Sequence, residues 1–593
     1  MPFADLRSFL SVLESSGELH RVRLEVEPEL EITEIAVRAV KENLPALLFE
    51  KVRGSTYPLT IGVLASEKRI EIALGKHPQQ IGEELLQLIE RLNPPSPKAI
   101  LHSLPGLFRF TQMRQTRSFL APSQQIAEEP DLSSLPIIKC WPKDGGRFIT
   151  FGLVITHDPR KGRRNMGVYR LQVYDENSTG MHWHIQHGGS AHAADARGQT
   201  MEVAVVIGAD PAMLLASVAP LTEGMDEIAF AGYLRGKPTP MIRAKTIAVD
   251  VPARAEFILE GIVDPNELKP EGPFGDHFGH YSHVVPFHVF HIRRLTRRKN
   301  PIYLAAVVGK PPQEDKFIGN ATQEMLGPLV KLIHPEVESL WAYYETGFHG
   351  LLVVSVRKRY HKEAVKTALG LLGIGQTSLT KVLILVGEGV DVRNFHAVLR
   401  EIQKNFDPSQ DFLLLPGTAY DTLDFTSFTQ ELGSKMILDA TRTTERNGQH
   451  SVQSREHEEG KAVSEIDPGT LVAGIVSYRY VERTLLAVKV VNNSREIVES
   501  LTKHPLLRNV KMIVAVSPDV DLNDDESLLW GIFTRFEPAR DIVFGHTELR
   551  GSLAVHSGPM GINAAWKQGY PEPLVMDERI LKRVDETWER YWR

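Results

Sequence analysis

The chain has 593 residues, of which 42% are apolar and 24% are charged, and its formal net charge is −6. This length exceeds what a single hydrophobic core supports, so we expect two to four domains of an ordinary globular protein. The mild acidity gives no reason to expect nucleic acid as a partner.

The first 112 residues predict an N-terminal α/β domain. Asp5, Arg7 and Glu14 interrupt the first apolar run, so we expect neither a signal peptide nor a membrane span there. Residues 1–20, 30–43 and 78–93 predict helices that alternate with short apolar strands. The lone cysteine, Cys140, excludes an intramolecular disulfide and a thiolate-cluster metal site. We take a cytoplasmic location as the default.

Residues 113–318 predict a β-rich domain. An extended, proline-containing connector comes first, and strand-like runs such as ITFGLVITHD, GVYRLQVYD and MEVAVVIGA follow. We interpret this domain as a barrel, with a sandwich as the alternative.

Residues 319–441 predict an α/β layer domain, followed by a polar linker at 442–468. The remainder, 469–593, repeats that α/β domain. KVLILVGEGVDV at 381–392 matches KMIVAVSPDVDL at 511–522, and NFDPSQD at 405–411 matches RFEPARD at 535–541 with the same offset. Matches in one order and spacing indicate an internal duplication. We expect a structural or oligomerising role for the second copy.

The stretch from Asn165 to Gly189 combines an arginine, several histidines and a glycine pair. GVYRLQVYD predicts a strand, DENSTG a turn, and MHWHIQH the returning strand of a hairpin. His182 and His184 then share one face, and His187 falls beside the glycines, where the chain can approach a ligand closely. This density of donors and metal-capable groups predicts a site.

Two loops supply carboxylates. Glu223 lies in PLTEG, and EGPFGDH carries Glu271 and Asp276 on a loop rich in glycine and proline. An arginine can hold one carboxylate as its anion, while a neighbouring carboxyl in a drier place has its pKa raised and can donate a proton. Asn165, His187 and Glu223 would make a nitrogen and oxygen ligand set suited to Mn²⁺ or Mg²⁺, with His182 and His184 as rival ligands.

NMGVYRLQ, TGMHWHIQHGG, PLTEG, EGPFGDH and GSKMILDAT, in this order and at these separations, resemble the UbiD family of decarboxylases, which use prenylated FMN. The resemblance runs from the N-terminus to about Thr441. It implies an N-terminal α/β domain, a central split β-barrel that binds the flavin, and a C-terminal α/β domain used for dimerisation. It also implies reversible, non-oxidative decarboxylation of aromatic or α,β-unsaturated acids, and a flavin prenyltransferase that supplies the cofactor.

The resemblance also assigns residues by position. The implied metal ligands, for manganese or magnesium, are Asn165, His187 and Glu223, with potassium often nearby. The implied cofactor contacts are Val168, Tyr169, Arg170, His182, Trp183, Gln186, His187, Gly188 and, at the phosphate, Lys381. The implied catalytic network is Arg170, Glu271 and Asp276.

Several alternatives stay open. MHWHIQHGG departs from the MHWQ-x-H pattern of many relatives. The position of the histidine ligand could therefore differ by one residue. From the resemblance we expect the acid to be a quinone precursor such as a 4-hydroxy-3-polyprenylbenzoate of ubiquinone synthesis, with a dihydroxynaphthoate of menaquinone synthesis as the alternative. We expect a homodimer or a larger homo-oligomer without a transmembrane segment, and peripheral membrane contact if the substrate is prenylated. The alternatives in function are an FMN reductase on a split barrel and a subunit of a carboxylase complex.

Overall fold

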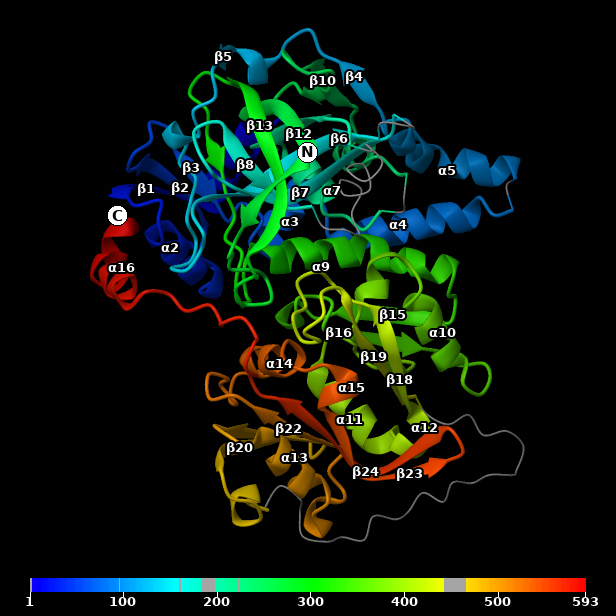
Figure 1. Ribbon diagram of the computed structural model, residues 1–593. Coiled ribbons are helices and arrows are strands. Elements are labelled where there is room, and N and C mark those ends of the chain that lie inside the picture. Colours follow the sequence, from blue (N-terminus) through cyan, green and yellow to red (C-terminus); the bar gives the residue numbers. More distant parts are fainter. Residues whose placement is uncertain (1–2, 95, 159–161, 184–197, 222–223, 442–465) are drawn as a thin grey trace. The chain divides into compact units, whose positions relative to one another are not determined.

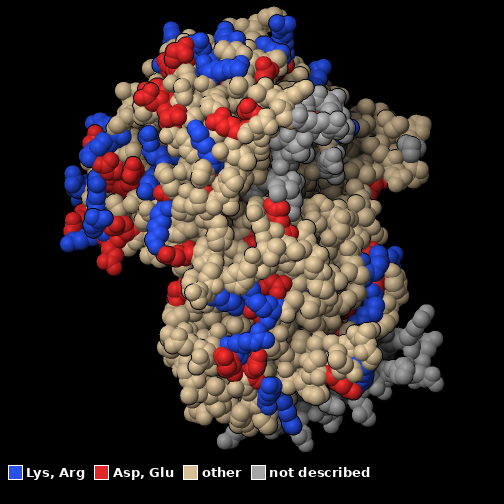
Figure 2. Space-filling view, in the orientation of Figure 1, with Lys and Arg blue, Asp and Glu red and all other residues tan. Residues whose placement is uncertain are grey.

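The computed structural model describes all residues except 1–2, 95, 159–161, 184–197, 222–223 and 442–465 (Figure 1). The chain forms two compact units, Met1–Leu326 with Pro571–Arg593 and Gly327–Tyr570. Within the described ranges, no helix is both long and apolar enough to cross a membrane. Figure 2 shows Lys and Arg interspersed with Asp and Glu on the visible face, without a large area of one sign.

The first unit begins with an α/β layer. Its sheet has the order β1-β2-β3-β14 (Leu19–Val26, Ala46–Val52, Leu59–Ile61 and Tyr303–Leu304). Its helices are α1 to α5 (Leu6–Ser15, Glu31–Lys41, Glu67–Leu74, Pro78–Arg91 and Pro97–Phe110). The first helix is shorter than the predicted 1–20, because Gly17 adopts a φ of 74° and β1 begins two residues later.

The centre of the first unit is a seven-stranded sheet that confirms the β-rich prediction. Its order is β5-β13-β12-β9-β6-β7, with β8 paired to β13. These strands are β5 Ile126–Glu128, β6 Phe148–His157, β7 Arg164–Gln172, β8 Ser178–Met181, β9 Met201–Ile207, β12 Phe257–Glu271 and β13 Val285–Arg297. The described strands do not close into a barrel by hydrogen bonds, since β5 and β7 remain end strands.

The central sheet nevertheless curls. The ladder of β12 with β13 is irregular between Asp264 and Leu268, and the far half of β12 then carries Glu271 to Arg170 on the end strand β7. A three-stranded sheet of β11, β10 and β4 completes this part, with bounds Asp250–Pro252, Thr239–Arg243 and Gln115–Arg117. Further helices of the first unit are α7 Pro211–Ala216, α8 Glu227–Arg235 and α9 Glu314–Leu326.

The second unit contains two five-stranded sheets of the same topology, which confirms the duplicated α/β copy. The first sheet has the order β15-β16-β17-β19-β18 (Val337–Ala342, Leu351–Val356, Val382–Gly387, Leu432–Ala440, Phe412–Ala419). The second has the order β20-β21-β22-β24-β23 (Ile475–Val481, Leu485–Val490, Met512–Val516, Leu553–Ala564, Ile542–Arg550). Helices α10, α11 and α12 (Glu363–Leu371, Phe395–Asn405, Pro408–Asp411) correspond in order to α13, α14 and α15 (Ser494–Thr502, Asp525–Phe533, Pro538–Asp541).

The chain then returns to the first unit. Helix α16 (Glu578–Tyr591) packs beside α2, where the Tyr591 hydroxyl donates to Glu31 at 2.6 Å (Figure 1). Ahead of this helix, the amide of Leu574 donates to the carbonyl of Gly279 at 3.0 Å, and the amide of Tyr281 donates to the carbonyl of Glu572 at 3.0 Å. The C-terminal segment therefore holds the loop that follows β12.

Candidate active site

A buried ion pair joins β7 to the end of β12. Arg170 Nε and Nη2 donate to the two carboxylate oxygens of Glu271 at 2.9 and 3.1 Å. Glu271 is fully buried, and the Arg170 side chain is 7% exposed. This two-point geometry fixes the guanidinium plane, and it keeps both charges paired where water does not reach them.

The loop after β12 turns a second carboxylate onto the same arginine. Gly272 has a φ of 99°, a conformation that side chains other than glycine rarely adopt, and the loop then brings Asp276 into an ion pair with Arg170 Nη1. The other Asp276 oxygen lies 2.8 Å from His277 Nδ1 and accepts from the His277 amide. Arg170 Nη2 also donates to Ser282 Oγ at 3.2 Å.

The two carboxyl groups are anions in this arrangement. Burial favours their neutral forms, but the charge of Arg170 and the hydrogen bond from His182 lower the pKa of Glu271 to about 2. For Asp276 burial is likewise outweighed, by the hydrogen bond from His277 and the charge of Arg170, which lower its pKa. This differs from the expected raised pKa of a proton donor, because Asp276 pairs with the arginine as directly as Glu271 does.

Two histidines belong to this network, and the sequence indicated neither role. His182 Nδ1 lies 3.1 Å from Glu271, and its ring packs on Phe287 with centroids 4.0 Å apart. Burial and the charge of Arg170 lower the pKa of His182, so the neutral imidazole donates to the carboxylate. His182 was expected at the cofactor or the metal, and His277 was not singled out, since neither fits a motif of acid–base chemistry.

Two further acids surround the loop. Asp144 accepts from the amides of Gly275 and Trp141 at 2.8 and 2.9 Å, and burial raises its pKa to about 7. Asp315, near the start of α9, has its pKa raised to about 6, chiefly by burial, with His277 opposing and Asp276 reinforcing the shift. Both are distant in sequence from EGPFGDH, so only the fold reveals them.

The described part of the predicted hairpin ends at Trp183, and the rest of its returning strand lies outside the described residues. β8 ends at Met181 and pairs with β13. A bridge between Val173 and Thr179 joins it to the β7 end, and the amides of Tyr174 and His182 donate to the carbonyls of Ser178 and Arg170 at 3.0 and 3.4 Å. At the end of β7, the Gln172 side chain donates to the Gly145 carbonyl and accepts from the Gly272 amide. Beyond β8, Trp183 packs edge-on against Tyr169 with centroids 5.3 Å apart.

The structure describes only some of the remaining predicted site residues. Asn165 and Val168 lie on β7, while His184, Gln186, His187, Gly188 and Glu223 lie outside the described residues. Within the described ranges, no group of three or more His, Cys, Asp or Glu residues could hold a metal ion. Lys381 lies in the second unit, where it is buried and donates to Asp424 at 2.8 Å. The metal set and the phosphate partner stay predictions.

Comparison with known families gives matches along most of the chain. Three domain profiles of a 3-octaprenyl-4-hydroxybenzoate carboxy-lyase match: the UbiD N-terminal domain at 10–89, the Rift-related domain at 114–311, and the C-terminal domain at 316–440 and 474–565. A protein of Chlamydia pneumoniae, named as one of the subunits of a 4-hydroxybenzoate decarboxylase, is 33% identical over 592 residues, which is 99% of this chain and 98% of that protein.

Two solved structures are similar to this chain over most of its length. Vanillic acid decarboxylase of Sedimentibacter hydroxybenzoicus in its closed form has a TM-score of 0.67 and 28% identity, covering 76% of this chain and 95% of its own. An evolved dimeric form of the enzyme HmfF of Pelotomaculum thermopropionicum, in complex with prenylated FMN, has a TM-score of 0.63 and 26% identity, covering 76% and 97%.

Proposed function

Since the chain belongs to the UbiD family of aromatic acid carboxy-lyases, we propose that it decarboxylates an aromatic acid reversibly and without net oxidation, with prenylated FMN as cofactor. The single observation that carries this proposal is the buried network in which Arg170 bridges Glu271 and Asp276. An FMN reductase has no use for such a network.

The residues of β7 and the segment after β8 fit a ligand rich in acceptor atoms. Arg164 Nε, Asn165 Nδ2 and Trp183 Nε1 are buried donors without a hydrogen-bond partner in the described part of the chain. Buried donors in native proteins normally have acceptors, so these three favour a polar ligand at this place. A flavin, with its ring carbonyls and phosphate, would satisfy them. We propose Asn165, His187 and Glu223 as the ligands of a manganese ion beside it.

Prenylated FMN, when bound, would supply the sink for the electron pair that CO₂ leaves behind. The protein positions and charges the substrate. Arg170 would orient the substrate carboxylate, and Glu271 keeps Arg170 charged and fixed in its plane. Glu271 in turn is held by His182.

Asp276 would deliver the proton that replaces CO₂. Its resting form is the anion, but a substrate carboxylate arriving beside it adds a like charge, which raises the pKa of Asp276 and favours its neutral form. His277 Nδ1, 2.8 Å from Asp276, is placed to return the proton after each turnover.

The test replaces Asp276 by Asn in protein co-expressed with a flavin prenyltransferase. We expect turnover to be abolished, because Asn carries no transferable proton, while flavin binding is retained by absorbance and mass spectrometry. Asp276→Glu keeps the carboxyl and should retain part of the activity. CO₂ release at the normal rate by Asp276→Asn would remove Asp276 from the mechanism.

The substrate is proposed as a quinone precursor, a 4-hydroxy-3-polyprenylbenzoate, with a dihydroxynaphthoate as the alternative. A screen of both acids, with vanillate and 4-hydroxybenzoate as comparisons, would separate them. The Chlamydia pneumoniae relative is named as part of a multi-subunit enzyme, which favours a second version, in which the chain works in a complex. A further chain that co-purifies from its own host and raises turnover would support this version.

A further inference from the structure

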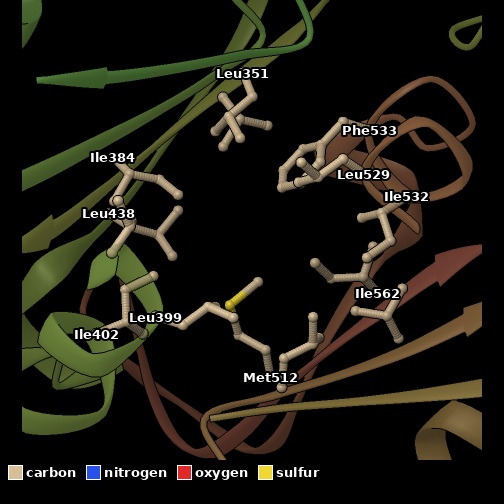
Figure 3. Packing of buried hydrophobic residues seen from close by; sticks show 14 of the residues in the cluster. Leu351, Ile384, Leu399, Ile402, Leu438, Met512, Leu529, Ile532, Phe533 and Ile562 are labelled. Atoms are coloured by element: carbon tan, nitrogen blue, oxygen red, sulfur yellow. The ribbon is translucent and has the colours of Figure 1, made fainter. Parts of the chain in front are cut away.

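The two α/β copies of the second unit share one hydrophobic core. Side chains from β16, β17, β19 and α11 of the first copy point toward side chains from β22, β24 and α14 of the second (Figure 3). Leu399 and Phe536 are fully buried in it, and Trp530 is 1% exposed. The labelled members in Figure 3 are Leu351, Ile384, Leu399, Ile402, Leu438, Met512, Leu529, Ile532, Phe533 and Ile562.

The contacts across this core are reciprocal. Lys381 and Lys511 occupy equivalent positions of the repeat, and so do Phe406 and Phe536, each pair 130 residues apart. Lys381 Nζ lies 5.4 Å from the ring centre of Phe536, and Lys511 Nζ donates to the carbonyl of Phe406 at 2.8 Å. Each lysine therefore contacts the equivalent phenylalanine of the other copy.

A second pair repeats this reciprocity at the rim. The strand registers place Tyr344 and Glu482 at equivalent positions, each two residues beyond a matched strand pair, and His396 is equivalent to Glu526. The Tyr344 hydroxyl donates to Glu526, and His396 Nδ1 lies 3.0 Å from Glu482. Likewise α12 contacts β24, while its counterpart α15 contacts β19.

Reciprocal contacts of this kind define an isologous interface, the type that joins two identical subunits about a two-fold axis. We propose that the second copy is a covalently attached partner, which fills within one chain a self-complementary face that a second copy of the chain would otherwise occupy. The face is therefore closed to other chains, and any homo-oligomer of this protein assembles through other surfaces. This inference does not depend on the reaction that the first unit performs.

An engineered disulfide tests whether the face is filled within one chain. The Ala539 amide donates to Ser434 Oγ at 2.8 Å, so the two Cα atoms lie within about 7 Å, the range that a disulfide spans. The native Cys140 is buried and does not compete. In the full-length double variant Ser434→Cys/Ala539→Cys, oxidation should give a crosslinked product of one chain's mass at every protein concentration.

Two further samples complete the test. A mixture of singly substituted Ser434→Cys and Ala539→Cys chains should give no Ser434–Ala539 dimer, because neither face is open to the other chain. The double variant His396→Cys/Glu482→Cys lies at a rim site where both side chains are partly exposed. It should crosslink within one chain with a short bis-maleimide reagent, even if the first pair perturbs folding. A dimer joined between position 434 of one chain and position 539 of another, or no intrachain crosslink in either double variant, overturns the proposal.

Discussion

Replacing Glu271 by Gln tests how strongly the buried network holds the curled sheet together. Glutamine keeps the shape of the side chain but removes the charge that pairs with Arg170. Folding lowers the pKa of Glu271 from 4.5 to about 2, which favours the folded state by about 3 kcal/mol at neutral pH. Because the folded pKa is the lower one, this contribution is complete above pH 4.5 and is lost as the pH falls toward 2.

Hydrogen exchange of peptides from β7 and β12 is the suitable assay, because a chain of two units does not unfold in one step. At pH 7, Glu271→Gln should raise exchange through local opening about a hundredfold, since 1.4 kcal/mol is a factor of ten. Near pH 3 about 1.4 kcal/mol of this contribution remains, so the difference should fall to about tenfold, and it should vanish only below about pH 2.

Glu267→Gln is the matched control on the same strand. Glu267 pairs with His291 at 2.6 Å, but both side chains are more than a third exposed, and such surface pairs contribute about 1 kcal/mol or less. Equal effects of the two substitutions would refute the reasoning, because they would show that burial of the Arg170 pair adds nothing to stability.

Three further substitutions probe the surroundings of the same loop. Asp315→Asn should gain thermal stability over the natural protein as the pH rises from 3.8 to about 6, because the raised pKa of Asp315 opposes folding increasingly across that window; a constant difference across the pH series would contradict this. Gly145→Ala would place a Cβ 2.3 Å from the Gly272 carbonyl, so turnover should fall at least about tenfold, while Gly387→Ala, with open space around its Cβ, should leave turnover unchanged. Leu574→Pro removes the hydrogen bond to the Gly279 carbonyl and should lower kcat more than it changes KM. Val575→Pro, at an exposed neighbouring residue, is the control. Equal kcat values for the two variants would count against a role for that bond.

The parts of the site that lie in short motifs, and the internal repeat, could be predicted from the sequence. Arg170, Glu271 and Asp276 lie in motifs that can be recognised in the linear sequence, and the structure brings the three side chains together. The constant offset of 130 residues indicated the duplicated α/β copy, and the structure confirms it by the matching order of the two sheets. His182 was visible but received another role, because its neighbour Glu271 comes from a strand 89 residues away. The partners of β8 and the places of Asp144 and Asp315 follow from how β12 bends, which no local pattern specifies.

The return of the chain to the first unit has a consequence for synthesis. The backbone bonds from Glu572 and Leu574 to the Asp276 loop join residues separated by nearly half the chain, and both copies of the α/β domain lie between them in sequence. Because a ribosome releases the chain from its N-terminus onward, the site stays incomplete until residues 571–574 have emerged. A nascent chain stalled inside the second unit would contain Arg170 and Glu271. It would lack the backbone hydrogen bonds that Glu572 and Leu574 make to the neighbouring loop. We therefore expect activity only after translation has passed the second unit.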